Sequence, residues 1–178
     1  IDKYNVLILP NAGQLGENKN AFKNALGQQT GIVKSSYSNN SFPGVNNTTV
    51  FKSAGSEQDR IMGLYYADYD HQDVMKFEIK EGRYFSRDFP SDSTAILLNE
   101  AAVREFGFTN PIGEQIIFND DNKKEILTVI GVYKDFNFES LKTKIRPLSI
   151  RLTNDSYQLM IRYDGDAADV VATVEQLC

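Results

Sequence analysis

The sequence predicts an α+β fold in which one α/β subdomain is split by an inserted β-rich subdomain. Residues 4–33 have a β-α-β pattern, residues 147–177 have a β-β-α pattern, and the stretch between them contains mostly strand-like runs. A chain of 178 residues with 41% hydrophobic and 24% charged residues can bury a substantial core. We expect residues 1–49 with 145–178 to form one subdomain and residues 50–144 to form the other.

The first β-α-β unit begins with an apolar run at residues 4–9, which stops at Pro10. The helix that follows has Phe22 and Leu26 on one face, and Gly27 is placed to end it before a second strand opens at residues 31–33. Residues 35–49 contain many Asn and Ser residues and few apolar ones, which predicts a long loop where the chain crosses between subdomains.

The middle of the chain predicts strands at residues 49–52 and 61–66, a short helix after Asp70 and a hairpin formed by residues 115–118 and 125–132. Between them, Asn99 has the residue type and position of an N-cap. The helix it opens is expected to end at Gly107. Gly131, inside the second hairpin strand, is expected to allow another backbone to approach closely.

The last part of the chain predicts strands at residues 147–152 and 157–163 and a final helix capped by Asp166. Its apolar face consists of Val170, Val171, Val174 and Leu177. Because the chain starts at Ile1 without Met and ends at Cys178 within this apolar pattern, we expect it to be the soluble piece of a longer protein.

Composition excludes several classes of protein and of site. The net charge is -5 and no basic stripe is present, so nucleic acid is not an expected partner. The only cysteine is Cys178, which rules out an internal disulfide, a CxxC motif and a structural zinc site. No segment approaches the roughly 20 apolar residues that span a bilayer.

One acidic cluster includes the only histidine and could in principle gather a metal ion: Asp68, Asp70, His71 and Asp73. Helix capping explains the same residues better, with Asp70 as the N-cap and Asp73 at the N3 position. Residues 119–122 resemble half of a calcium loop but lack its Gly and Glu. GxSxG and phosphate-binding glycine motifs are also missing, so we expect no catalytic residues, no metal and no cofactor.

Aromatic residues are the remaining candidates for a binding site. Most are expected in the core, although together they could line a ligand groove with tyrosine hydroxyls as polar groups. They are Tyr65, Tyr66, Tyr69, Phe77, Tyr84, Phe85, Phe89, Phe136 and Phe138.

Five short motifs follow one another between residues 81 and 147. They are Glu81-Gly82-Arg83-Tyr84-Phe85-Ser86, Leu98-Asn99-Glu100-Ala101-Ala102, Asn110-Pro111-Ile112-Gly113, Val129-Ile130-Gly131-Val132-Tyr133-Lys134-Asp135-Phe136, and Glu139-Ser140-Leu141 with Ile145-Arg146-Pro147. In this order they resemble the MacB-like periplasmic core domain, the extracytoplasmic insertion between the first two membrane helices of FtsX-like ABC transporter permeases.

The resemblance implies a porter-like α/β subdomain with an inserted second lobe, located on the periplasmic or extracellular face of a bacterial membrane. It implies no catalytic residues, because ATP is hydrolysed by a separate cytoplasmic subunit or domain that does not contact this one. Flanking membrane helices absent from this chain would anchor the domain in a permease dimer. Its role would be to couple movement of those helices to export or to a periplasmic partner protein.

A contact to the other lobe or to a partner is expected on a polar and aromatic stretch near the end of the motif region. Its residues are Asp135, Phe136, Phe138, Glu139 and Leu141. The alternative function is that of a free-standing periplasmic ligand-binding module with a tyrosine-rich surface, and an enzyme that depends on His71 or Asp70 is a third hypothesis.

Overall fold

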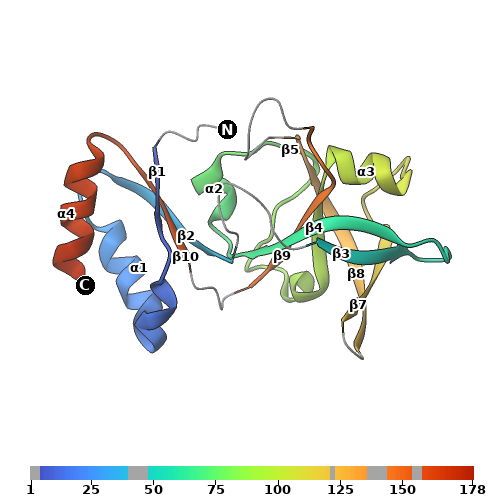
Figure 1. Ribbon diagram of the computed structural model, residues 1–178, viewed down its shortest axis with the longest axis horizontal. Helices are drawn as coiled ribbons and strands as arrows, with labels where there is room; N and C mark the ends of the chain where they lie inside the picture. Colours follow the sequence, from blue (N-terminus) through green and yellow to red (C-terminus); the bar gives the residue numbers. More distant parts are fainter. Residues whose placement is uncertain (1–4, 40–47, 121–122, 136–143, 154–157) are drawn as a thin grey trace. The chain divides into compact units, whose positions relative to one another are not determined.

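The computed structural model describes residues 5–39, 48–120, 123–135, 144–153 and 158–178. Within them it confirms a mixed α+β fold, with ten strands and four α-helices (Figure 1). None of these helices combines the length and the apolar character that crossing a lipid bilayer requires.

The chain divides into two compact units. Unit 1 consists of Ile1–Asn39, Ala67–Lys76 and Thr153–Cys178, and unit 2 consists of Asn40–Tyr66 and Phe77–Leu152. These units differ from the boundaries expected from the sequence at residues 67–76, which belong to unit 1, and at residues 145–152, which belong to unit 2. The division into a porter-like part and an inserted part stays a prediction.

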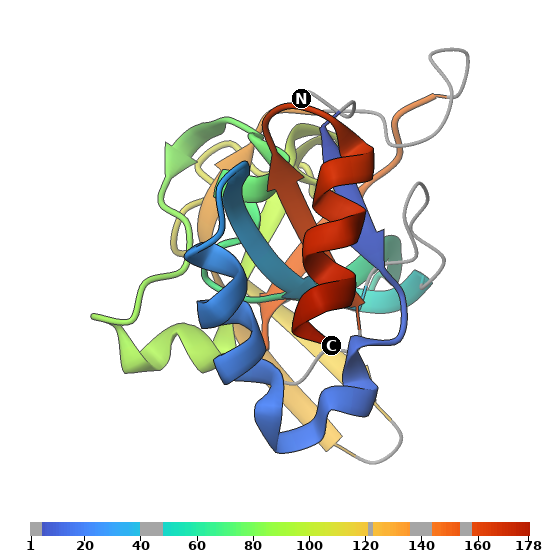
Figure 2. The same ribbon diagram turned by 90° about the vertical axis from the view of Figure 1, so that its left-hand side faces the viewer.

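Unit 1 is built on three antiparallel strands in the order β1-β10-β2. Side chains alternate across them: Leu159 and Ile161 of β10 enter the core beneath α1 and α4, while Met160 and Arg162 lie on the opposite face, together with Ser36 of β2. Figure 2 shows α1 and α4 in front of the strands. The elements are β1 (Val6–Leu9), a 3-10 helix (Ala12–Asn18), α1 (Lys19–Gly27), β2 (Ile32–Ser38), α2 (His71–Met75), β10 (Gln158–Tyr163) and α4 (Ala167–Leu177).

Three details of unit 1 correct the expectations. Residues 35–38 are not loop but the buried second half of β2, because their backbone pairs with β10 and Tyr37 packs in the core of unit 1. Gly27 is the last residue of α1 and not its C-cap, since the C-cap is Gln28 in a right-handed conformation. Val171 is 40% exposed, whereas Val170 and Val174 are buried as expected.

Unit 2 is built on strands whose order returns to its starting point. The order is β4-β3-β7-β8-β6-β9, and β9 also pairs with β4. At that junction the Gly63 N–H donates to Pro147 O at 2.9 Å and the Ser149 hydroxyl donates to Gly63 O at 2.8 Å. The elements are β3 (Thr48–Ser53), β4 (Arg60–Ala67, whose last residue belongs to unit 1), β5 (Ile79–Gly82), a 3-10 helix (Pro90–Thr94), β6 (Ala95–Asn99), α3 (Glu100–Phe106), β7 (Gln115–Asp120), β8 (Lys123–Tyr133) and β9 (Leu148–Leu152).

The core of unit 2 lies inside this closed order of strands. Apolar residues from β3, β4, β6, β7 and β8 meet there, and Ala102 and Phe106 of α3 pack among them. The strand residues are Phe51, Met62, Leu64, Ile96, Leu98, Ile116, Phe118, Leu127 and Val129. A closed arrangement leaves no unpaired strand edge around the core, which favours a stiff unit.

Gly131 sits where β8 is most crowded. It pairs with Gly82 of β5 on one side and with Leu97 of β6 on the other. A Cβ atom at this position would lie 2.3 Å from Arg83 O and 2.5 Å from Leu97 Cδ2. The predicted close approach of another backbone is therefore confirmed, and only glycine fits here without displacing a strand.

Replacing Gly131 should weaken unit 2. The substitution Gly131→Ala pushes its methyl group against a backbone carbonyl that cannot rotate away. We expect the free energy of unfolding to fall by about 2 kcal/mol or more, measured by urea denaturation.

A matched control is Gly27→Ala, because a Cβ on Gly27 would meet nothing within 4 Å inside α1. That change should leave stability unchanged or raise it by about 0.5–1 kcal/mol. Equal stability losses in the two variants would contradict the close packing described at Gly131.

Candidate functional site

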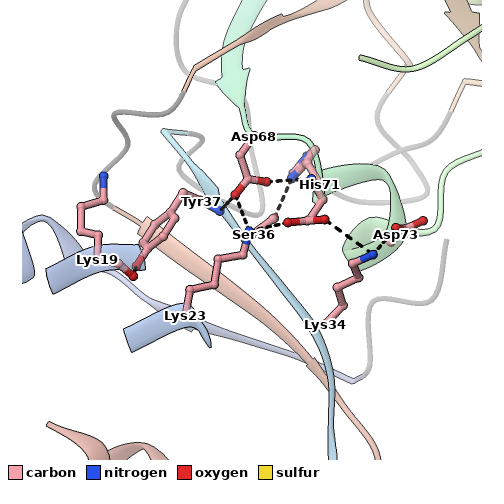
Figure 3. A network of polar contacts seen from close by, with 9 residues as sticks. Lys19, Lys23, Lys34, Ser36, Tyr37, Asp68, His71 and Asp73 are labelled. Atoms are coloured by element: carbon pink, nitrogen blue, oxygen red, sulfur yellow. Dashed lines mark hydrogen bonds and ion pairs between the residues drawn. The ribbon is translucent and has the colours of Figure 1, made fainter. Parts of the chain in front are cut away.

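The acidic cluster singled out in the sequence lies on and just before α2 in unit 1. Figure 3 shows its carboxylates facing side chains from α1 and β2. Asp68 accepts hydrogen bonds from the Tyr37 N–H at 2.9 Å and from Lys23 Nζ at 3.0 Å. Its other oxygen accepts from the Asp70 N–H at 3.0 Å. Burial raises the pKa of Asp68, while Lys23 and these backbone N–H groups act in the opposite direction.

Asp70 and Asp73 are also paired with lysines. Asp70 bonds to Lys23 and lies 3.5 Å from Lys34 Nζ, which is 2.8 Å from Asp73. Asp70 occupies the N-cap position of α2 as predicted, but the expected capping role of its carboxylate is wrong, because the side chain makes no capping hydrogen bond and pairs with lysines instead. In the part of the chain that the structure describes, no group of three His, Cys, Asp or Glu residues could hold a metal ion.

His71 is fully buried under the same cluster. Its Nδ1 lies 3.3 Å from the Ser36 hydroxyl, and both residues are 0% exposed. Burial lowers the pKa of His71 from 6.5 to about 3, so the imidazole is neutral at physiological pH. A side chain with no exposed surface cannot reach a substrate, which removes His71 as a candidate general base in this conformation.

Asn99 is the central residue of a second polar site, in unit 2. Its Oδ1 accepts from the Ala102 N–H at 2.8 Å, which confirms the predicted N-cap, and also from the Leu148 N–H at 3.0 Å. Its Nδ2 donates to Arg146 O at 3.0 Å. One buried amide therefore fixes both the start of α3 and the chain that enters β9.

Asp135 lies at the same end of α3. Its carboxylate accepts from the Ala101 N–H at 2.8 Å and pairs with Arg104 at 2.8 Å. Its own N–H donates to Glu100, which also pairs with Lys80 at 2.8 Å. Lys80 and this N–H hold the pKa of Glu100 below its usual value. The other predicted contact residues, Phe136, Phe138, Glu139 and Leu141, lie outside the described residues.

Arg83, in the first of the sequence motifs, pairs in bidentate geometry with Asp92, both bonds measuring 2.8 Å. The Ser86 N–H donates to the same carboxylate at 2.9 Å. Burial alone would raise the pKa of Asp92, but these donors together hold it below its usual value. The motif around Gly82 is thus explained by packing and ion pairing rather than by catalysis.

Aromatic residues of the predicted ligand groove mostly fill the interior. Tyr65, Phe77, Tyr84 and Phe85 are at most 9% exposed, and only Phe89 among the described members is strongly exposed, where it stacks with Arg83. Phe136 and Phe138 lie outside the described residues.

A pocket of about 420 Å³ opens in unit 1 beside the end of α4. No local pattern predicted this pocket, because its walls come from three separated segments of the chain. The pocket is lined by Leu9, Pro10, Asn11, Ala12, Gln14, Leu15, Phe22, Val174 and Cys178.

Sequence reasoning also missed Lys23 and Lys34, the cations of the α2 cluster. Lys23 is 45 residues from Asp68 and Lys34 is 39 residues from Asp73. No local pattern links positions so far apart, whereas the acidic residues were found because they lie close together.

Comparisons with known proteins agree with this structure. The sequence matches the MacB-like periplasmic core domain over residues 5–177. A comparison with curated proteins finds no match.

Similar solved structures include the periplasmic region of MacB from Actinobacillus actinomycetemcomitans, with a TM-score of 0.68 and 17% identity over 98% of this chain and 82% of that one. A domain of a protein described as a permease from Porphyromonas gingivalis gives a TM-score of 0.64 and 16% identity, covering 96% and 80%. The extracellular domain of the ABC-type transporter YknZ from Gram-positive bacteria gives 0.61 and 19%, covering 95% and 86%.

At these identities the solved structures establish the shared fold, and the match over residues 5–177 establishes the family. The motifs at Gly82, Asn99 and Gly131, read from the sequence as a family signature, hold the strands and α3 of unit 2 together. This chain belongs to the MacB-like periplasmic core domain family and is an extracytoplasmic domain of an ABC transporter permease.

Proposed function

We propose that this domain is a non-catalytic mechanical part of its permease, which passes the ATP-driven movement of the membrane helices to an exported substrate or to a periplasmic partner protein. Membership of the family implies an ATP-binding partner. In this proposal that partner is cytoplasmic and does not touch the domain, the permease acts as a dimer, and flanking membrane helices anchor each copy.

The observation that carries the proposal is that the groups best suited to chemistry are used for structure. The only histidine has no exposed surface, and Asp68 and Asp70 are paired with Lys23. Asn99 and Asp135 hold α3 and the chain around it. Such a distribution favours a domain that transmits force over one that catalyses a reaction.

The stiffness of unit 2 supports a role in contact with other molecules. Asp135 is fixed to the start of α3, and Arg146 and Leu148 are fixed to the same place through Asn99. The chain on both sides of residues 136–143 is therefore held by one rigid support. We place the lobe or partner contact on Asp135, Phe136, Phe138, Glu139 and Leu141, of which Asp135 is the one that the structure describes.

Ligand binding is the second candidate function, and the pocket beside α4 favours it. Its volume of about 420 Å³ falls in the range of roughly 300–1,000 Å³ that holds small organic molecules. Its mostly apolar lining would select an apolar compound. Under this alternative the domain would bind a molecule in unit 1 rather than transmit movement.

Nucleotide-dependent movement can be measured by electron-spin distance measurements on the full-length permease with its ATP-binding partner. In a Cys178→Ser background, which removes the exposed native thiol, a spin label on Glu57→Cys, whose wild-type side chain is fully exposed in unit 2, reports the distance between the two copies of the dimer. We expect this distance to change by roughly 5 Å or more between the ADP state and a non-hydrolysable ATP analogue.

The matched control is the pair Glu57→Cys and Lys124→Cys within one copy, both exposed and both in unit 2. That distance should stay constant because the strands between them are hydrogen-bonded neighbours. An inter-copy distance that is the same in both nucleotide states would contradict the coupling role, and the absence of any inter-copy signal would contradict the dimer.

A thermal-shift screen of small apolar compounds separates the two functions. The transmission role predicts no saturable rise in Tm. The ligand-binding alternative predicts a saturable rise of several degrees at about 100 times Kd. It also predicts that the rise is lost in Leu15→Lys, which alters the pocket wall, and kept in Val171→Lys, which changes an exposed position of α4.

A further inference from the structure

α2 is too short to be stable by itself. It has five residues and no side-chain cap, and it ends at Lys76 in a left-handed conformation with φ 54°, which is unfavourable for a residue other than glycine. Its position therefore depends on what it packs against, which is the face of β2 and β10 opposite α1 and α4.

Two kinds of contact hold α2 in that place. One is ionic: Lys23 and Lys34 pair with Asp68, Asp70 and Asp73. The other is buried and polar. Arg162 Nε donates to Val74 O at 2.6 Å, and the His71 ring meets the Ser36 hydroxyl.

We propose that the segment Ala67–Lys76 is an acid-releasable latch, docked on the β2 and β10 face of unit 1 at neutral pH and detached as the extracytoplasmic medium becomes acidic. This goes beyond the proposed function and does not rest on it, because the contacts named above all join residues of unit 1.

The charges around His71 decide the direction of the effect. Arg162 of β10 donates to the Val74 carbonyl, while Lys23 of α1 and Lys34 of β2 pair with Asp68, Asp70 and Asp73 of the segment that carries His71. Tyr37 is neutral, because burial, with a smaller contribution from Asp68, raises its pKa to about 12. Because the three carboxylates are already paired with the two lysines and the His71 ring is fully buried, desolvation disfavours a proton on the imidazole.

Release of the segment is linked to proton binding because His71 has a different pKa in the docked and released conformations. When docked, His71 has a pKa of about 3, and when released it regains the ordinary value of 6.5. Between pH 6.5 and about 3, only the released form binds a proton on His71. The equilibrium constant for release therefore rises by up to about tenfold for each pH unit below 6.5. Burial raises the pKa of Asp68 in the docked form, which favours docking in acid and makes the observed slope shallower than this limit.

Release would change how this segment is anchored. Ala67–Lys76 belongs to unit 1, but the residues before and after it belong to unit 2. When detached, this ten-residue segment could extend to roughly 33–36 Å as a loop with both of its ends in unit 2.

Hydrogen exchange on the whole chain tests the latch. The reporters are the Val74 and Lys76 amides, which donate to Asp70 O and Gln72 O when α2 is formed. Protection factors, which remove the intrinsic pH dependence of exchange, should fall by roughly 10- to 100-fold between pH 6.5 and about 4.5. The Ala102 and Gly107 amides of α3 should keep their protection.

The matched variant is His71→Gln, which keeps a hydrogen-bonding side chain but cannot titrate; its Val74 and Lys76 protection should change by less than about threefold over the same range. Three results would overturn the proposal: constant protection in the wild type, an equal loss in His71→Gln, or an α3 loss that parallels that of α2.

Should His71→Gln fail to fold, an NMR titration of the wild-type imidazole decides the matter. A docked His71 that stays neutral down to about pH 4 while the Val74 and Lys76 amides lose protection supports the latch, and one that stays neutral with no loss of protection, or that titrates near 6.5 without release of α2, contradicts it.

Discussion

The buried amide of Asn99 joins three parts of unit 2 that the backbone alone would leave separate. It ends β6, caps α3 and holds the backbone at Arg146 and Leu148 where the chain enters β9. A side chain with one acceptor oxygen and one donor nitrogen is needed to serve all three, since the cap and Leu148 require an acceptor and Arg146 O requires a donor. Asn99 therefore positions the start of β9, the strand that closes the sheet of unit 2 by pairing with both β6 and β4.

Three carboxylates likewise hold separate elements or turns of the chain together. Asp135 attaches the end of β8 to α3, Asp92 attaches Arg83 and Ser86, and Asp68 attaches α2 to β2 and α1. In each case a carboxylate accepts both a backbone N–H and a charged side chain. Such charge-assisted hydrogen bonds are stronger than neutral ones and fix the backbone at each of these positions.

Local signals in the sequence predicted much of the fold. Asn99, Gly107 and Asp166 were recognised as helix ends, the β7–β8 hairpin was located, and Gly131 was recognised as a point of close approach, because each depends on neighbouring residues or on backbone geometry. Residues 35–38 were missed because serines are typical of loops, and their burial depends on β10, more than 100 residues away.

The candidate site was harder to predict. Asp70 looked like a cap until Lys23 and Lys34 were placed beside it, and these pairings have no local signature. The closure of β9 on β4 is equally non-local, as is the assignment of residues 67–76 to unit 1. The sequence indicated close approach at Gly131, but its neighbours there, Arg83 and Leu97, are identified only by the three-dimensional structure.

The structural role of the Asn99 hydrogen bonds is tested most directly by urea denaturation of the Asn99→Ser and Asn99→Ala variants, compared with each other and with the wild type. Serine can still cap α3 but is too short to reach Leu148 and Arg146. Asn99→Ser should therefore lower the free energy of unfolding by about 2 kcal/mol or more, and Asn99→Ala by about 1 kcal/mol beyond that. An Asn99→Ser variant within about 0.5 kcal/mol of the wild type would contradict the account, because it would show that Asn99 acts only as a helix cap.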